Sequence, residues 1–160
     1  MAIEYVLLLK ENGLSVEDLT KKVASLGYCC DRLEKLDKGI GISLQEEIGF
    51  SIFLVDSPRF PYNRWETIFL PNDFTFQKVL RFRFNKDYDD YRRRYIEMLE
   101  TIFDLMDEIK QDAILVRDEV ELCYFRKDNQ IILNNESGIW DKECFRDFIQ
   151  NKNIRYIDTK

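Results

Sequence analysis

The stretch from Lys78 to Asn134 constrains the fold most, because its hydrophobic pattern changes period twice. It opens with an alternation that places Leu80, Phe82 and Phe84 on one face and Arg81 and Arg83 on the other. Alternation of this kind is typical of a strand with one buried and one solvated face. We therefore expect a strand over residues 79–84.

A helical pattern follows this strand. Asp87, Asp89 and Asp90 stand where a helix start favours carboxylates, both for capping and for the helix dipole. Beyond them, apolar and aromatic residues recur every three or four positions: Tyr88, Tyr91, Tyr95, Leu99, Ile102, Met106 and Ile109. This stripe predicts a helix of about six turns over residues 87–109, buried along one side.

Strand patterns then return at residues 113–116, 120–125 and 131–133, with a turn at Asp128-Asn129. A long helix is thus preceded and followed by strands. Nearby strands of this kind pair antiparallel, and we expect the helix to pack on them.

The N-terminal part of the chain continues the same mixture. Residues 3–9 are apolar and predict a central strand. Ser15 and Asp18 have the spacing of a capping box for a helix that Gly27 ends. Residues 28–36 are ambiguous between strand and helix, and we favour a strand. Residues 39–44 and 50–55 should form a hairpin, with glycines giving the first strand one thin face.

The remaining elements are shorter. Residues 65–70 predict a short strand, and residues 154–157 an edge strand. Trp140 begins a last helix, whose expected buried side consists of Cys144, Phe145, Phe148 and Ile149. The chain therefore predicts a single α+β domain over residues 1–160. It combines a mostly antiparallel sheet with one long helix and two shorter helices.

The chain contains no histidine. This excludes Ser-His-Asp and Cys-His nucleophile activation, histidine-ligated zinc and imidazole acid–base chemistry. The sequence also has no nucleophile elbow, EF-hand loop or glycine-rich phosphate loop. We therefore expect a protein that is not an enzyme and that holds no cofactor and no metal ion.

The net charge of the chain indicates which kinds of partner it could bind. The chain has 24 basic and 30 acidic residues, a net charge of −6. Nucleic acid and anionic membranes are negatively charged as well, so we expect neither as a partner. A basic protein would suit this balance, although acidic residues also serve solubility alone. The sequence leaves the oligomeric state open.

The cysteines are Cys29, Cys30, Cys123 and Cys144, and they form no Cys-x-x-Cys pair. We interpret all four as reduced packing residues. The first residues lack a basic start, and the apolar runs are too short to cross a membrane. The sequence thus predicts a cytoplasmic protein.

One segment, residues 56–64, is irregular because Pro58 and Pro61 interrupt regular structure. It nevertheless carries aromatic and arginine residues, which are enriched at the energetic centres of protein interfaces. We predict a partner-binding site formed by Asp56, Arg59, Phe60, Tyr62, Arg64 and Trp65. The alternative is that these aromatic residues fold back and cover one edge of the core.

Arginine and carboxylate clusters are two further candidates for a site. Arg92, Arg93 and Arg94 could grip phosphate, but Glu97 and Glu100 follow at spacings that favour ion pairs on a helix surface. We expect a solvated helix face there.

Carboxylate residues also cluster at three places in the sequence, all outside any metal-binding motif: Glu46 with Glu47, Asp104 with Asp107 and Glu108, and Asp118 with Glu119 and Glu121.

Several segments resemble the immunity proteins of the myxobacterial swarm-inhibition toxin type, which are also found in bacterial polymorphic toxin systems. The resembling segments are residues 1–9, a short early helix after them, and residues 80–86, 112–116, 122–126 and 132–135, together with Met98 in the long helix and Trp140. Residues 28–77 show no such resemblance.

This resemblance implies an immunity protein that neutralises a cognate toxin by direct, stoichiometric binding and has no catalytic residues. The toxin domain would be encoded by the adjacent gene, and the protein would act in competition between bacteria. Two other functions stay open. One is a non-catalytic adaptor or interaction domain of a bacterial assembly, and the other is a carboxylate- or metal-dependent hydrolase.

Overall fold

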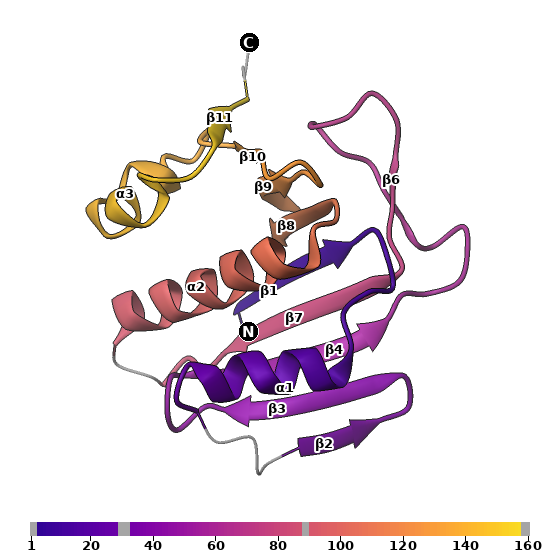
Figure 1. The fold of residues 1–160 in the computed structure, drawn as a ribbon, viewed down its shortest axis with the longest axis vertical. Helices are drawn as coiled ribbons and strands as arrows, with labels where there is room; N and C mark the ends of the chain where they lie inside the picture. Colours follow the sequence, from indigo (N-terminus) through magenta and orange to yellow (C-terminus); the bar gives the residue numbers. More distant parts are fainter. Residues whose placement is uncertain (1–2, 29–32, 88–89, 158–160) are drawn as a thin grey trace.

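The computed structural model describes residues 3–28, 33–87 and 90–157 (Figure 1). Its main sheet is built from these strands: β1 Ile3–Leu9, β2 Leu33–Leu36, β3 Gly39–Leu44, β4 Phe50–Asp56, β7 Lys78–Phe84, β8 Ala113–Arg117, β9 Val120–Phe125, β10 Ile131–Leu133 and β11 Ile154–Tyr156. Two short strands, β5 (Arg64–Trp65) and β6 (Phe74–Thr75), pair with each other outside this sheet.

The strand order of the nine-stranded sheet is β11-β10-β9-β8-β1-β7-β4-β3-β2. Neighbouring strands are antiparallel from β2 to β10, and β11 runs parallel to β10. The predicted α+β class with a mostly antiparallel sheet is confirmed. The β3–β4 hairpin, the central position of β1 and the edge strand β11 are confirmed as well.

The sheet has two faces, which the alternation in β1 and β7 separates. Leu7 pairs with Leu80 and Tyr5 with Phe82, and these side chains belong to the larger buried cluster. Val6 pairs with Arg81 on the opposite face. We call the face with the larger cluster the inner face and the other the outer face.

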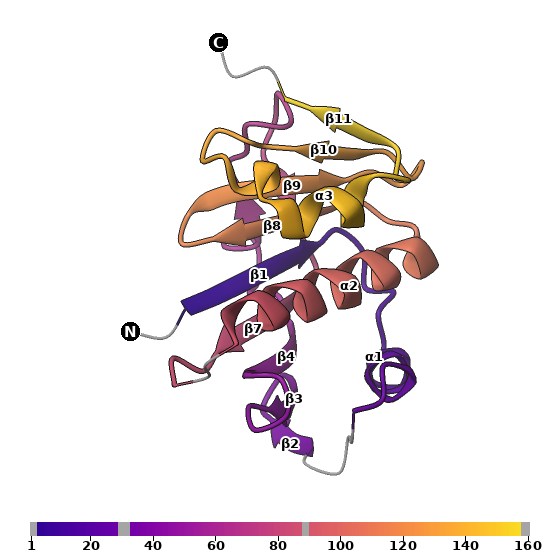
Figure 2. The ribbon, with the colours of Figure 1, turned by 90° about the vertical axis from the view of Figure 1, so that its left-hand side faces the viewer.

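Three α-helices lie on the inner face: α1 (Val16–Ser25), α2 (Tyr91–Ile109) and α3 (Glu143–Ile149), with a 3-10 turn η1 (Ile139–Asp141) before α3. Figure 2 shows α2 alongside β1 and β7, with α3 towards β9 and α1 towards β3 and β4. The capping box of α1 is confirmed, because the Asp18 amide donates to the Ser15 hydroxyl at 3.1 Å and the Ser15 amide to the Asp18 carboxylate at 3.4 Å.

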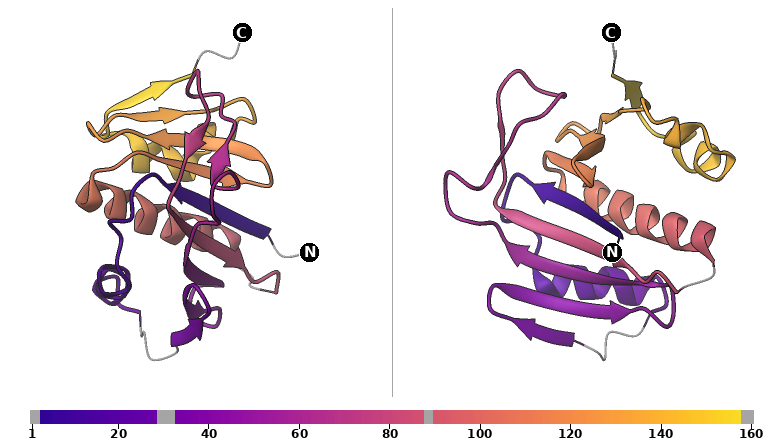
Figure 3. Two further views of the ribbon diagram at one scale, coloured as in Figure 1. Left: turned by 90° about the vertical axis from the view of Figure 1, so that its right-hand side faces the viewer. Right: turned by 180° about the vertical axis from the view of Figure 1, so that it is seen from behind.

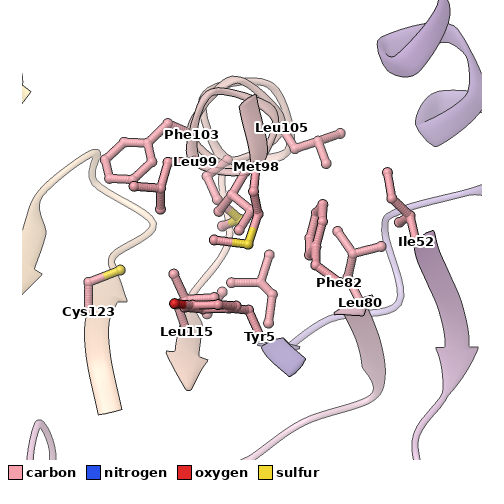
Figure 4. Packing of buried hydrophobic residues seen from close by; sticks show 14 of the residues in the cluster. Tyr5, Ile52, Leu80, Phe82, Met98, Leu99, Phe103, Leu105, Leu115 and Cys123 are labelled. Carbon is pink, nitrogen blue, oxygen red and sulfur yellow. The ribbon is translucent and has the colours of Figure 1, made fainter. Parts of the chain in front are cut away.

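The core between α2 and the sheet is apolar (Figure 4). Met98 and Leu105 of α2 project towards Phe82 and Leu115 of the sheet, and all four side chains are buried. Leu19 of α1 joins the same cluster. One continuous core therefore extends across the inner face.

The start and the buried side of α2 differ from the prediction. The helix begins at Tyr91 and not at Asp87, and the Asp90 carboxylate caps it by accepting from the Arg93 amide at 3.0 Å. Tyr88 and Asp89 lie outside the described residues. Tyr91 is exposed, whereas Arg94 is completely buried. The expectation of a solvated Arg94 is therefore wrong.

The physical reason is the position of Arg94 in the same row of the helix as Met98 and Leu105, facing the sheet. Its guanidinium lies 4.3 Å from the ring centroid of Phe84 and 4.8 Å from that of Tyr91. Nη1 donates to the Asn85 carbonyl at 2.5 Å. Aromatic faces and a carbonyl thus take the place of water around this cation.

Other boundaries also differ. Residues 65–70 do not form a strand beyond Trp65, because β5 has two residues. In the ambiguous segment 28–36, strand β2 covers residues 33–36, and Cys29 and Cys30 lie outside the described part. The last helix is split into η1 and α3, with Phe145 and Ile149 buried and Cys144 partly buried. The predicted burial of the Phe148 side chain lies outside the described part of the structure.

Candidate partner-binding surface

Residues 57–77 leave the sheet after β4, cross its outer face and return to β7 (Figure 3). We call this segment the arm. Its two halves are joined by the β5–β6 pairing and by a bond from the Phe76 amide to the Asn63 carbonyl at 3.0 Å. A bond from the Ser57 amide to the Gln77 carbonyl at 3.0 Å closes its base. The arm is therefore an ordered hairpin-like extension.

Aromatic residues attach the arm to the outer face. Phe74 and Phe76 are buried in a second cluster with Leu8, Ile114 and other outward-facing side chains of the sheet. Phe69 stacks on Tyr124 with ring centroids 5.8 Å apart. This cluster is independent of the inner core and fixes the arm over β1, β8 and β9.

Glu121 of β9 provides a polar anchor for the same segment. The residue is only 8% exposed, and its carboxylate accepts hydrogen bonds from the Thr67 hydroxyl and, at 3.0 Å, from the Ile68 amide. A register shift between Leu115 and Val116 places Val116 opposite Glu121 on the outer face. The sequence shows only that Glu121 lies in no metal-binding motif, whereas in the structure the arm covers its carboxylate.

The six predicted contact residues fall into two groups. Phe60 and Tyr62 are 71% and 77% exposed, and the Arg64 guanidinium lies 5.2 Å from the Phe60 ring centroid. Arg59 is exposed beside them. These four residues form an exposed aromatic and basic tip, which we call the arm tip.

Trp65 and Asp56 have other surroundings. Trp65 packs against the second cluster, and its indole N–H is buried without a hydrogen-bond partner among the described residues. Asp56 is the last residue of β4, and its carboxylate lies 3.6 Å from the Lys78 ammonium. Trp65 therefore covers the outer face of the sheet, as the alternative prediction expected, whereas Phe60 and Tyr62 face outward.

Two adjoining hollows lie beside the arm on the outer face. The first, about 510 Å³, lies between Tyr62, Arg64 and Trp65 of the arm and the sheet, and reaches Arg81. The second, about 570 Å³, extends from Arg81 to Phe53 and Arg83. Together they form a groove from the arm to the half of the sheet that contains β4 and β7.

Arg83 and Phe53 are surface residues that the sequence analysis did not assign to a site. The Arg83 guanidinium lies 5.5 Å from the Phe53 ring centroid and bonds to the Glu4 carboxylate at 2.8 Å. The Phe53 ring lies over Gly41, where a Cβ atom would be 3.0 Å from the ring. The Phe53 ring therefore packs on the thin glycine face that was predicted for residues 39–44. The alternation of Arg81 and Arg83 was the available signal for this solvated face.

Burial sets the protonation of several groups near the two clusters. It raises the pKa of the Cys123 thiol, which is free and fully buried. Burial, followed by the nearby Glu97 and Asp104 carboxylates, raises the pKa of Glu100. Burial and Glu97 raise the pKa of Tyr28 to about 12. All of these groups are held in their neutral forms more strongly than in water.

Within the described ranges, no group of three or more cysteine and carboxylate side chains could hold a metal ion. Cys144, the other described cysteine, is also free. In the same part of the chain, no helix is both long and apolar enough to span a membrane.

A wide antiparallel sheet, with helices on one face and an arm on the other, defines an α+β protein. The sequence model of the SitI3-like family matches residues 3–144, so the chain belongs to this family. SitI proteins are immunity proteins of myxobacterial swarm-inhibition toxin systems. The resemblance recognised in the sequence is thereby confirmed, and the match also includes residues 28–77.

No curated protein and no solved structure matches the chain. The family membership by itself indicates an immunity protein, suggests a non-enzymatic role and implies a toxin as the partner.

Proposed function

We propose that this protein neutralises a cognate toxin of a bacterial polymorphic toxin system in the cytoplasm by direct, one-to-one binding. The observation that carries the proposal is the match to an immunity-protein family over residues 3–144. The toxin domain would be the product of the adjacent gene, and neutralisation would require no catalytic step by this chain.

We further propose that the arm tip, together with the groove beside it, contacts the toxin. Phe60 and Tyr62 expose large aromatic surfaces, whereas the other aromatic residues of the arm are buried or partly buried against the sheet. Burying such side chains at an interface removes apolar area from water. Because the second cluster and Glu121 anchor the arm, little conformational entropy is lost when a partner binds.

The groove supports this placement through its chemistry. Arg64 and Arg81 supply donors for carboxylates or carbonyl groups, and Glu4 supplies an acceptor. Aromatic and arginine side chains surrounded by polar residues are the composition of an interface centre and its rim. Trp65 packs between this surface and the second cluster, and Asp56 lines the second hollow.

The interface is tested by replacing Phe60, Tyr62 and Arg64 together by alanine and measuring toxin binding by calorimetry. We expect a loss of about 2 kcal/mol or more, which is roughly a 30-fold increase in Kd. The melting temperature should stay near that of the unmodified chain, because these side chains are exposed.

A matched control replaces Val16, Arg146 and Tyr156, which are exposed on α1, α3 and β11, by alanine. This control should retain the original Kd. A folded arm-tip variant that binds the toxin with unchanged Kd would contradict the placement of the interface without contradicting neutralisation itself.

A further inference from the structure

A separate hollow of about 390 Å³ lies on the inner side of the molecule, between the first turns of α2, the end of β8 and the η1–α3 segment. Tyr91, Tyr95 and Phe145 contribute aromatic surface to its lining. The arm lies on the opposite face of the sheet. The proposed toxin surface therefore does not include this hollow, which we call the inner hollow.

The charged lining of the inner hollow is mostly cationic. Arg92, Arg117 and Lys142 line it, against the single carboxylate of Glu143. This excess of positive charge is unusual on a chain whose net charge is −6. Three cations from α2, β8 and the α3 segment therefore line one hollow, and each would attract an anion bound there.

Within the described part of the chain, these three cations have few ion-pair partners. The ion pairs within the described residues do not include Arg92 or Lys142. The only ion pair of Arg117 there is a long one, 3.8 Å from Nε to the Asp118 carboxylate. A guanidinium that is this weakly paired can still donate to a carboxylate or a phosphate.

A buried donor stands directly behind this lining. Tyr5 is 1% exposed, and its ring contacts Tyr95 edge-to-face at 5.7 Å and the Arg117 guanidinium at 5.5 Å. The Tyr5 hydroxyl is buried and interacts with Tyr95 and Arg117, but it makes no hydrogen bond of normal geometry among the described residues. A buried hydroxyl without such a hydrogen bond is costly. An acceptor oxygen entering between Tyr95 and Arg117 would offset that cost.

We propose that the inner hollow binds a small organic anion that carries a planar ring. The ring would pack against Tyr91, Tyr95 and Phe145, while a carboxylate or phosphate group meets Arg117, Lys142 and Arg92. The volume lies at the lower end of the range of small-molecule sites, about 300–1,000 Å³. This inference does not depend on the proposed toxin binding.

The first test is an NMR titration of the ¹⁵N-labelled chain with phenyl phosphate, inorganic phosphate and benzyl alcohol. Phenyl phosphate combines the ring and the charge, and each of the other probes has one of the two. We expect phenyl phosphate to shift the amides around Tyr95 and Cys144 and to bind about ten-fold more tightly than either other probe. Equal binding of benzyl alcohol, or shifts confined to other surfaces, would overturn the proposal.

The second part of the test compares phenyl phosphate binding by two double variants. Arg117→Gln with Lys142→Gln should weaken phenyl phosphate about ten-fold or more. The control, Lys127→Gln with Arg155→Gln, removes two cations from an outer hollow of about 530 Å³ that also contains an aromatic ring, Tyr124. The control should bind phenyl phosphate like the unmodified chain, and an equal loss in both variants would contradict a specific site.

Cys144 gives a readout on the unmodified chain, should the inner-hollow variant fail to fold. Its thiol is free, partly exposed and part of the lining. Phenyl phosphate should slow alkylation of Cys144 by iodoacetamide, measured by mass spectrometry of the peptide that contains it. Alkylation at the same rate with and without a saturating excess of phenyl phosphate would show that the hollow does not take this anion.

Discussion

At the scale of single residues, Arg94 is the least expected feature of the chain. A buried arginine requires compensation, and here Phe84, Tyr91 and the Asn85 carbonyl provide it. Its Nε and Nη2 atoms have no hydrogen-bond partner among the described residues. Arg94 therefore depends on ring contacts that only a planar guanidinium makes well.

This dependence gives a prediction for Arg94→Lys. The ammonium keeps the charge but loses the planar stacking and is harder to desolvate, so the free energy of unfolding should fall by about 1–3 kcal/mol. Urea denaturation measures this difference. Arg94→Met, which fills similar space without a charge, should cost less than Arg94→Lys. A lysine variant as stable as the unmodified chain would contradict the role assigned to the rings.

The sequence could not predict this arrangement. Periodicity identified the helix, because Leu99, Ile102 and Met106 recur at helical spacing. It assigned Arg94 to the solvated side because of its charge, although position 94 shares a helix face with Met98 and Leu105. The helix packs on the sheet and is flanked by α1 and α3, so a wider arc of α2 is buried than one apolar stripe indicates.

At the scale of elements, the strands that alternate were predicted and the arm was not. The alternation of β7 depends on neighbouring residues, so it is visible in the sequence. The arm is held instead by contacts distant in sequence, such as Phe69 with Tyr124 and Thr67 with Glu121. A β-bulge sets which face Glu121 occupies, and periodicity does not show where a bulge falls.

Glu121→Ala should therefore release the arm selectively. It leaves the Thr67 hydroxyl and the Ile68 amide without their acceptor, and we expect a loss of about 1–3 kcal/mol in the free energy of unfolding. Hydrogen exchange of the arm amides near Ile68 should accelerate, while exchange in the α2 core stays slow. Glu119→Ala, at an exposed neighbouring position, is the matched control. Unchanged exchange in the arm would show that Glu121 does not anchor it.

At the scale of the whole molecule, the two faces of the sheet carry different coverings. Helices α1, α2 and α3 cover the inner face, while the arm covers the part of the outer face around β1, β8 and β9. Around Phe53 and Arg83 the outer face stays open as a hollow. The proposed toxin surface combines this open part with the arm tip.

The different coverings of the two faces explain which parts of the structure could be predicted from the sequence. The class, the central strands and the family followed from short-range patterns and from resembling segments. The six predicted contact residues do not share one environment. The aromatic content of residues 60–65 could not reveal this difference, because it does not show which rings pack inward. Trp65 packs on the sheet, whereas Phe60 and Tyr62 face solvent. Only the long-range fold distinguishes them.

The most direct measurement is co-expression of this chain with the toxin domain of the adjacent gene, followed by purification and native mass spectrometry. Direct neutralisation predicts that cells survive and that a complex with one copy of each chain is recovered. Cell death, or survival with no complex between the two chains, would contradict neutralisation by direct binding.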